Sequence, residues 1–250
     1  MRLYFMYNGS IVLPPDHYLG IRKGAGYSIP VIMALVIHPV YGPILLDTGG
    51  NYARMEPFAQ RDFKTRDDLR VDKYLEKLSY CTDDVKHICI SHLHLDHGGY
   101  IDLFPKANIH VRKSEWISAL DLASVGYMPK DIDTYRNAGL CLNFIPDGVD
   151  YDVLGDGSLF CIDTHGHTAG HQSFVVELPN TGKVVIAMDC VQLEEDIYGE
   201  DFLKNENADP EGCLTAAKKM RALRESGAFV VCGHDPDQWE TMRSFPEYYD

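Results

Sequence analysis

Short apolar runs rich in valine and isoleucine recur along the chain, separated by glycine, proline and polar residues. Runs of this kind, bounded by turn-forming residues, predict β-strands. We expect strands at residues 3–7, 11–13, 31–37, 43–46, 86–91, 108–112, 141–145, 159–163, 172–178, 183–188 and 228–232. The pattern therefore predicts a protein in which most of the core is built from sheets.

Three other segments repeat their apolar residues at helical spacing. One carries Leu69, Tyr74, Leu75 and Leu78, the next carries Trp116, Ile117 and Leu120, and the last carries Leu214, Ala217, Met220 and Leu223. We expect Ser114 to cap the second helix. Asp209 and Pro210 are typical of a helix start and Gly227 of its end. The stretch 126–137 is expected to be irregular.

The order of these elements, strands followed by a helix, occurs twice along the chain. Two sheets packed face to face with helices on the outside satisfy that order, so we predict an α/β fold, a four-layered αββα sandwich. The 250 residues are 45% hydrophobic and contain no linker-like or low-complexity segment. One domain spanning residues 1–250 can bury a core of this size.

Charge and cysteine content narrow the class of protein. With 37 acidic and 23 basic residues, the formal net charge is −14, which disfavours nucleic acid as a partner. Four of the seven cysteines lie in apolar runs, as expected of reduced core thiols: Cys89, Cys161, Cys190 and Cys232. Neither a secretory leader nor a membrane-spanning apolar run is found, so we expect a cytoplasmic protein with no membrane partner.

The strongest chemical signal lies directly after the strand at 86–91. His92, His94, Asp96 and His97 place four metal-ligating side chains within six residues. Imidazole and carboxylate together suit zinc and similar divalent ions. Polar side chains packed so densely at a strand end serve no structural purpose, so we interpret them as metal ligands.

Three later segments add polar residues at the ends of apolar runs. His165, His167 and His171 follow the strand at 159–163, Asp189 follows 183–188, and His234 follows 228–232. Each alone is as expected of an ordinary loop residue. Four such segments in one chain favour a shared site at the rim of the sheets.

The segment His92 to His97 matches the pattern His-x-His-x-Asp-His and resembles the metallo-β-lactamase superfamily. The resemblance extends from Gly42 to the C-terminus. It implies two metal ions, zinc first, with manganese or iron as alternatives. One ion would be held by His92, His94 and His167, the other by Asp96, His97 and His234, with Asp189 bridging them. His171 and Asp47 would support the ligands, and His165 has no assigned role.

Several branches of the superfamily are disfavoured by particular residues. His94 stands where di-iron enzymes carry glutamate, and only 16 residues follow His234, too few for a helical substrate domain. The acidic charge disfavours nucleases, and β-lactamases are exported proteins. Stretches 3–5, 42–49, 233–235 and 245–248 are similar to the N-acyl homoserine lactonases, which are quorum-quenching enzymes.

That resemblance implies hydrolysis of a small-molecule lactone by a monomer or homodimer. Two alternatives of different kinds stay open. One is another small-lactone or ester hydrolase, such as a 4-pyridoxolactonase-like enzyme, whose family shares a Gly-Ser segment like Gly9-Ser10. The other is a metal-binding protein of this fold with little activity, although such proteins usually lose ligands and this chain keeps seven.

Two residues are expected to take part in the reaction. Asp96 can pass a proton from the attacking water to the departing alkoxide. Gln192 stands where the lactonases carry tyrosine, and its amide can donate a hydrogen bond to the carbonyl oxygen. Tyr198 is the alternative donor. An apolar groove for the acyl chain is expected from Met33, Phe58, Phe63, Tyr127, Met128 and Tyr135.

Overall fold

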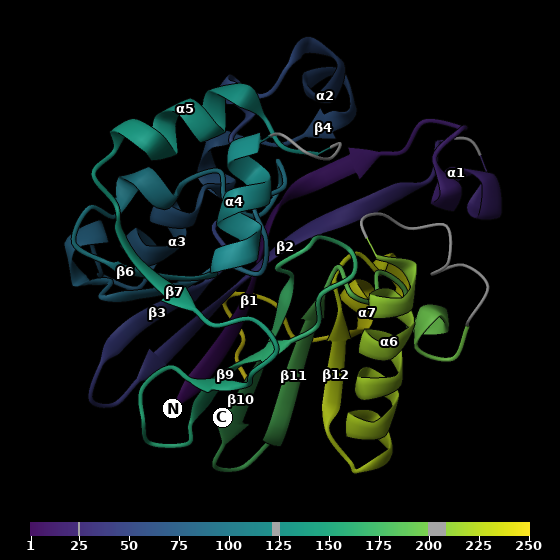
Figure 1. Cartoon of the computed structure of the whole chain (residues 1–250). Helices are drawn as coiled ribbons and strands as arrows, with labels where there is room; N and C mark the ends of the chain where they lie inside the picture. Colours follow the sequence, from purple (N-terminus) through teal and green to yellow (C-terminus); the bar gives the residue numbers. More distant parts are fainter. Residues whose placement is uncertain (25, 122–125, 200–208) are drawn as a thin grey trace.

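Two sheets packed face to face form the centre of the molecule, as seen in a computed structural model that describes residues 1–24, 26–121, 126–199 and 209–250 (Figure 1). The seven-stranded sheet has the order β4-β1-β2-β3-β5-β6-β7, and the five-stranded sheet has the order β12-β11-β10-β9-β8. The strands of the first sheet are β1 (Arg2–Val12), β2 (Ser28–His38), β3 (Gly42–Leu46), β4 (Phe63–Lys64), β5 (His87–Cys89), β6 (Asn108–Arg112) and β7 (Cys141–Ile145). Those of the second are β8 (Tyr151–Asp152), β9 (Leu159–Asp163), β10 (Gln172–Leu178), β11 (Gly182–Met188) and β12 (Phe229–Cys232).

Helices cover the outer face of each sheet, which completes the predicted four layers. The described α-helices are α1 (Tyr18–Lys23), α2 (Pro57–Asp62), α3 (Val71–Lys77), α4 (Lys113–Asp121), α5 (Pro129–Asn137), α6 (Pro210–Glu225) and α7 (Pro236–Thr241). In Figure 1, α3, α4 and α5 lie over the seven-stranded sheet, and α6 lies along β12 and β11. The prediction of an αββα sandwich is confirmed.

The strands explain this layering because their alternate side chains enter different cores. In β1, Leu3 and Phe5 lie in the core between the sheets, whereas Tyr4 and Met6 join the core under the outer helices. The same alternation holds in β11, where residues 184 and 186 face the other sheet and residues 185 and 187 face α6. Both faces of each sheet must therefore be covered, which an apolar strand read alone already indicates.

Two sequence expectations are wrong in detail. Residues 129–137 form α5, because Pro129 suits the first helical turn and Ile132 and Tyr135 are buried one turn apart. The polar residues between them hid that pattern. Ser114 does not cap α4; it lies within the helix, and its Oγ donates to Asp147 and to the carbonyl oxygen of Ala169.

Strand direction decides where the functional loops meet. In the first sheet β3, β5 and β6 are parallel, and in the second sheet β9, β11 and β12 run in one direction. The loops that follow these strands therefore leave each sheet at one edge. This arrangement allows distant segments to contribute to one site.

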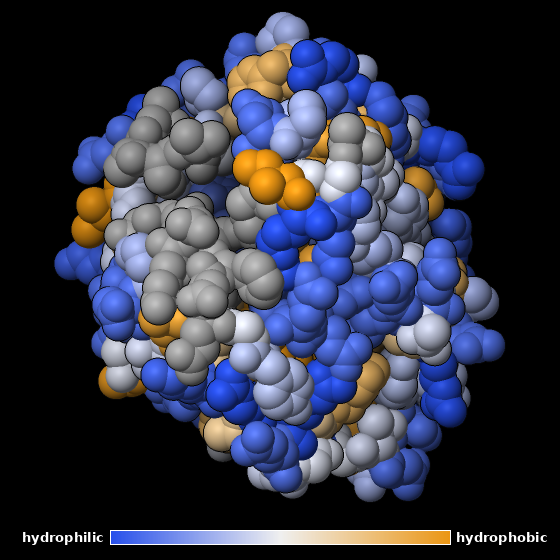
Figure 2. Space-filling model, turned by 90° about the vertical axis from the view of Figure 1, so that its right-hand side faces the viewer, coloured by the Kyte–Doolittle hydropathy of each residue, from blue (hydrophilic) through white to orange (hydrophobic). Residues whose placement is uncertain are grey.

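The exposed surface is largely polar. The face drawn in Figure 2 is mainly hydrophilic, with small, separate hydrophobic areas. Across the described residues, no helix combines the length and the apolar character needed to cross a lipid bilayer.

Candidate metal centre

The seven predicted ligands converge at one edge of the sandwich. His92, His94, Asp96 and His97 lie in the loop after β5, His167 in the loop after β9, Asp189 directly after β11, and His234 after β12. Each of them is buried, with at most 9% of its surface exposed. Both sheets thus contribute to the cluster.

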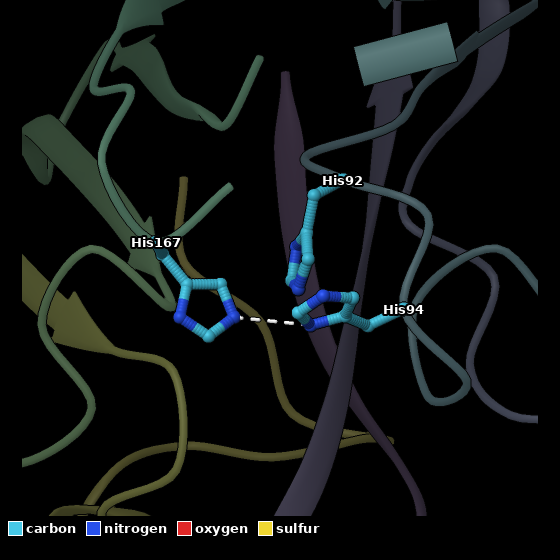
Figure 3. Close-up of side chains that lie close together, drawn as sticks. All are labelled: His92, His94 and His167. Atoms are coloured by element: carbon cyan, nitrogen blue, oxygen red, sulfur yellow. Dashed lines mark hydrogen bonds between the residues drawn. The ribbon is translucent and has the colours of Figure 1, made fainter. Parts of the chain in front are cut away.

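The side chains fall into two groups whose potential ligand atoms lie within 4.8 Å of one another. One group is His92, His94 and His167, and the other is Asp96, His97 and His234. In Figure 3 the three rings of the first group point toward one another, and His167 Nε2 lies 3.1 Å from His94 Nδ1. These are the two groups that the sequence resemblance implies, and the fold assembles each of them.

Asp189 lies between the two groups. Its Oδ2 is 3.4 Å from His167 Nε2 and 3.9 Å from His92 Nε2. Its Oδ1 is 3.2 Å from the Nε2 atoms of both His97 and His234. Oδ2 is also 3.2 Å from His234 Nε2. Since the carboxylate lies against both groups, it is placed to contact two ions at once.

The donor set fits divalent metal ions. The Nε2 atom of His92 is buried and has no hydrogen-bond partner, which is costly for a polar atom, and His94 turns its Nδ1 toward His167. Burial and the neighbouring imidazoles hold the pKa values of His92 and His94 well below their usual range. Neutral imidazoles with unused lone pairs, next to carboxylates, are the ligands that zinc prefers.

Charge is distributed differently in the second group. Burial opposes protonation of His234, but the Asp189 carboxylate outweighs it and raises the pKa of His234 to about 9. Burial likewise opposes protonation of His97, and Asp96 and Asp189 raise its pKa well above the usual range. The carboxylates of this group attract positive charge, which a bound cation would also satisfy.

Buried hydrogen bonds orient the ligands. Asp47, fully buried at the end of β3, accepts from the Ser91 backbone N–H at 2.7 Å and lies 2.7 Å from His97 Nδ1. The His171 ring accepts the Asp189 backbone N–H on Nε2 at 3.1 Å. Such contacts to the far side of a ligand fix its orientation. The supporting roles expected for Asp47 and His171 agree with these contacts.

The backbone around Asp189 leaves no room for a larger neighbour. Met188 has a positive φ of 50°, rare for a residue with a side chain. A Cβ on Gly233 would lie 2.7 Å from the Met188 carbonyl oxygen and 3.0 Å from Asp189 Oδ1. Glycine at position 233 therefore lets β12 deliver His234 close to Asp189.

A cavity of about 380 Å³ opens onto the cluster. Its lining includes His94, Asp96, His167, Asp189, Gln192 and His234, together with the apolar side chains Ile11, Leu13, Ile29, Phe58, Ala59 and Phe63. Gln192 is 8% exposed, and its Nε2 lies 3.4 Å from Asp189 Oδ2. The amide thus borders the space where a substrate would meet the metal centre.

The groove prediction is partly wrong. Phe58 and Phe63 line the cavity, but the other four expected residues, Met33, Tyr127, Met128 and Tyr135, are buried side chains outside its described lining. Residues of β1 and β2 take their place, because these strands extend past the sheet edge beside the cluster. Their strand pattern gave no sign of this role.

Two further residues lie outside the described cluster and cavity lining. Tyr198 is 54% exposed and stacks under the Arg221 guanidinium at 5.3 Å, so it is not placed to replace Gln192. His165 lies 2.7 Å from Asp163, with its side chain 47% exposed. Its lack of a ligand role in the sequence interpretation agrees with this position.

Sequence reasoning missed Glu115. This carboxylate is fully buried and contacts both loops that supply His94 and His167. In the sequence it is a glutamate near the start of a helix, where acidic residues are common on the surface. Nothing in the local pattern distinguishes it.

Known proteins provide a separate comparison. Residues 33–234 match the Metallo-beta-lactamase superfamily. The chain is similar to N-acyl homoserine lactonase AttM of Azorhizobium caulinodans, at 34% identity over all of this chain and 99% of that one. It is 29% identical to N-acyl homoserine lactonase AiiA of Bacillus thuringiensis subsp. kurstaki, over 99% and 98% of the two chains.

A solved structure gives the same indication at the level of the fold. An N-acyl homoserine lactone hydrolase, with its product N-hexanoyl-L-homoserine at the catalytic metal centre, superimposes with a TM-score of 0.83 at 27% identity. The match covers 99% of this chain and 98% of that one. The two architectures therefore agree over almost their whole length.

Proposed function

The chain belongs to the metallo-β-lactamase superfamily, and from this premise we propose that it is a metal-dependent lactonase that opens N-acyl homoserine lactones. The bond broken is the carboxylic ester of the lactone ring, with water as the second reactant. The observation that carries the proposal is Asp189, whose carboxylate lies between two ligand groups and contacts both, beside a largely apolar cavity. Full-length similarity to lactonases at 34% identity supports the same substrate class.

We propose that the two ions are zinc. The three-histidine group would hold one ion, the group of Asp96, His97 and His234 would hold the other, and Asp189 would contact both. When bound, two such ions supply Lewis acidity for the ester carbonyl and lower the pKa of water toward neutrality. Five imidazoles and two carboxylates support zinc over magnesium or calcium, which prefer all-oxygen ligands. Manganese and iron remain the alternatives.

The chain's own residues would then handle the substrate. The apolar wall of the cavity would take up the acyl chain and exclude water from it. The Gln192 amide would donate to the carbonyl oxygen as negative charge develops there. Asp96, which borders the cavity, would hold a proton on its carboxylate and deliver it to the departing ring oxygen.

We further propose that residues 1–250 act as one hydrolase domain, as a monomer or homodimer, with no nucleic acid or membrane partner. A reducing, cytoplasmic location is supported by the cysteines. All seven are described, no disulfide joins any of them, and five are buried. Disulfides are rare in proteins that work in reducing compartments.

A turnover screen tests this function. Zinc-loaded protein is assayed with N-hexanoyl homoserine lactone, 4-pyridoxolactone, a thioester and a β-lactam, with proton release and product mass as readouts. We expect ring opening, an added water in the product and saturation only with the homoserine lactone. Asp189→Asn should remove most turnover, whereas His165→Ala, at an exposed site, serves as the matched control.

The screen separates the alternatives. Preferential turnover of 4-pyridoxolactone would assign the chain to the other lactone class. The glutamine at position 192, where the homoserine lactonases carry tyrosine, would then be explained. Binding of two ions without turnover of any of the four compounds would support a metal-binding protein with little activity. Either result would overturn the proposed substrate.

A further inference from the structure

One buried carboxylate is not used by the proposed reaction. Glu115, the third residue of α4, has no exposed surface. A charged group is retained in such a place only where hydrogen bonds or opposite charges compensate for the lost water. Its partners therefore indicate what it does.

Four donors surround the carboxylate and use all of its acceptor positions. Oε1 accepts from the Leu93 backbone N–H at 2.8 Å and from the Tyr127 hydroxyl at 3.0 Å. Oε2 accepts from the Thr168 hydroxyl at 2.5 Å and from the Gly170 backbone N–H at 3.3 Å. The two oxygens thus face different segments of the chain.

Those segments are the ones that hold the three-histidine group. Leu93 lies between His92 and His94, and Thr168 directly follows His167. Tyr127 packs its ring against that of His94, with 5.0 Å between the centroids. One carboxylate therefore joins the loop from the first sheet to the loop from the second, next to every ligand of this group.

The approach of the second loop to α4 is unusually close. A Cβ on Gly170 would lie 2.3 Å from the Glu115 backbone nitrogen, so only glycine fits. The Ser114 hydroxyl also donates to the carbonyl oxygen of Ala169 at 3.1 Å. The first turn of α4, which contains Glu115, therefore packs directly against the loop that carries His167.

The other ligand group is braced by different residues. His97 is held by Asp47, and His234 Nδ1 contacts the Pro30 carbonyl oxygen at 2.8 Å. None of the four hydrogen-bond donors to Glu115 adjoins these two histidines in sequence. The contacts of Glu115 are thus confined to one side of the metal centre.

We propose that Glu115 is a positioning residue that sets the spacing between the His92–His94 loop and the His167 loop, and so tunes metal binding at the three-histidine group. The inference rests on the metal centre of the proposed function. Loss of Glu115 should weaken metal binding at the three-histidine group only, because the group formed by Asp96, His97 and His234 is held by other residues.

Glu115→Gln is the informative change because it keeps the shape and removes one acceptor oxygen. Whichever way the amide turns, its NH₂ faces a backbone N–H of either Leu93 or Gly170, and neither can reverse its role. We expect the affinity of the three-histidine group to fall about 10- to 100-fold, the usual effect of losing a partner behind metal ligands.

The two groups are separated by measuring in two backgrounds. His234→Ala leaves the three-histidine group as the better site, and His167→Ala leaves the other. Cobalt(II) is titrated into metal-free protein against a chromophoric chelator, with the visible cobalt absorption as a second readout. Glu115→Gln should weaken binding in the His234→Ala background and change it less than threefold in the His167→Ala background.

Equal weakening in both backgrounds, or none in either, would overturn the inference. Thr168→Val removes one donor while keeping the side-chain volume. In the His234→Ala background it should lower the cobalt affinity by a smaller factor than Glu115→Gln does. If Glu115→Gln does not fold, as judged by circular dichroism, the Thr168→Val result decides. Asp152→Asn is the matched control, since Asp152 also accepts backbone N–H groups, from Leu154, Gly155 and Gly157, but near the start of β9.

Cobalt binding by the unsubstituted parent protein distinguishes failure of the metal centre from failure of the role proposed for Glu115. Parent protein that binds no cobalt would contradict the metal centre itself. Parent protein that binds two ions, with a Glu115→Gln variant that binds them equally well, would contradict only the role of Glu115.

Discussion

At the scale of single residues, two side chains at the candidate metal centre are expected to take part in the reaction, the ligand Asp96 and the amide of Gln192. Asp96 belongs to the second ligand group and also borders the cavity, with Oδ2 3.7 Å from His234 Nε2. Gln192 borders the same cavity three residues after Asp189. Their positions allow each role to be tested by one substitution.

Removal of the Gln192 amide should slow the reaction. If it donates to the carbonyl oxygen in the transition state, Gln192→Ala should lower kcat and kcat/KM together, by roughly ten- to a thousandfold. Gln192→Tyr, which introduces the lactonase residue, should keep or raise activity on N-hexanoyl homoserine lactone. Steady-state kinetics of both variants decide the matter: rates within twofold of the parent for both would exclude a role for Gln192.

Asp96→Asn separates metal binding from proton transfer. The asparagine keeps an oxygen ligand but cannot carry the proton, so kcat should fall by more than metal affinity does. Esters with good leaving groups need no protonation and should lose least activity. The measurement compares kcat for activated and unactivated esters, and an equal loss for the two would contradict the proton-transfer role.

At the scale of elements, the ligands depend on how each strand ends. Asp47 follows β3 with a left-handed φ of 59°, and Met188 ends β11 with a φ of 50°. Residues held in this region cost about 1–3 kcal/mol each and persist where the surrounding contacts require them. Here the surrounding contacts come from the loops that carry the candidate ligands. The backbone strain therefore lies next to the ligand side chains and helps to orient them.

Asp47→Asn tests whether the end of β3 supports the second ligand group. Asparagine tolerates the left-handed backbone, so the change acts through the lost acceptor that faces Ser91 and His97. We expect the ion of the Asp96, His97 and His234 group to bind about 10- to 100-fold more weakly. Chelator competition measures this, with the exposed Asp156→Asn as control; unchanged affinity would mean that the bond to Asp47 does not orient His97.

At the scale of the whole molecule, the metal centre joins the two sheets. Four ligands follow β5 in one sheet, and three follow β9, β11 and β12 in the other. Ions bound across this junction would stabilise the folded chain, since the unfolded chain does not assemble the site.

Metal removal should therefore lower the free energy of unfolding. With free zinc at a thousand times Kd, each site contributes about 4 kcal/mol. Urea unfolding followed by circular dichroism, in zinc-buffered solution and with a chelator, should show a clearly lower midpoint after chelation. Identical midpoints would mean that the sheets do not depend on bound metal.

A second histidine cluster predicts a pH dependence of stability away from the metal. His110 on β6 contacts the ring of His87 and the amide of Asn143, and burial together with His87 lowers its pKa to about 4. Between pH 6.5 and 4 the unfolded chain takes up a proton that the folded chain does not. The contribution of His110 to the free energy of unfolding should therefore be fully present above pH 6.5 and fall by about 3 kcal/mol as the pH drops to 4.

His110→Asn removes this titration. Its stability should fall less steeply than that of the parent between pH 6.5 and 4, although it starts lower because a buried ring is lost. Urea midpoints across this range measure the two slopes, and both proteins keep the same metal-ligating histidines. Parallel slopes would contradict the assignment to His110.

Most of the architecture follows from local pattern. Apolar runs rich in valine and isoleucine predict the strands, and the order of strands and helices indicates four layers. The candidate ligands were also predicted from the sequence, because four of them lie within His92 to His97 directly after an apolar run and the others follow later apolar runs. Where this failed, as in α5, polar residues concealed two buried positions one turn apart.

What the tertiary structure alone decided concerns contacts between segments far apart in the chain. The sequence predicts Asp189 as a ligand, but the contact of its carboxylate with both ligand groups depends on the order and direction of β9, β11 and β12. Glu115 is an ordinary helical glutamate until two loops from different sheets fold onto it. Periodicity reports only which face of an element is buried, whereas the partner of a buried polar group is set by sheet topology and loop packing.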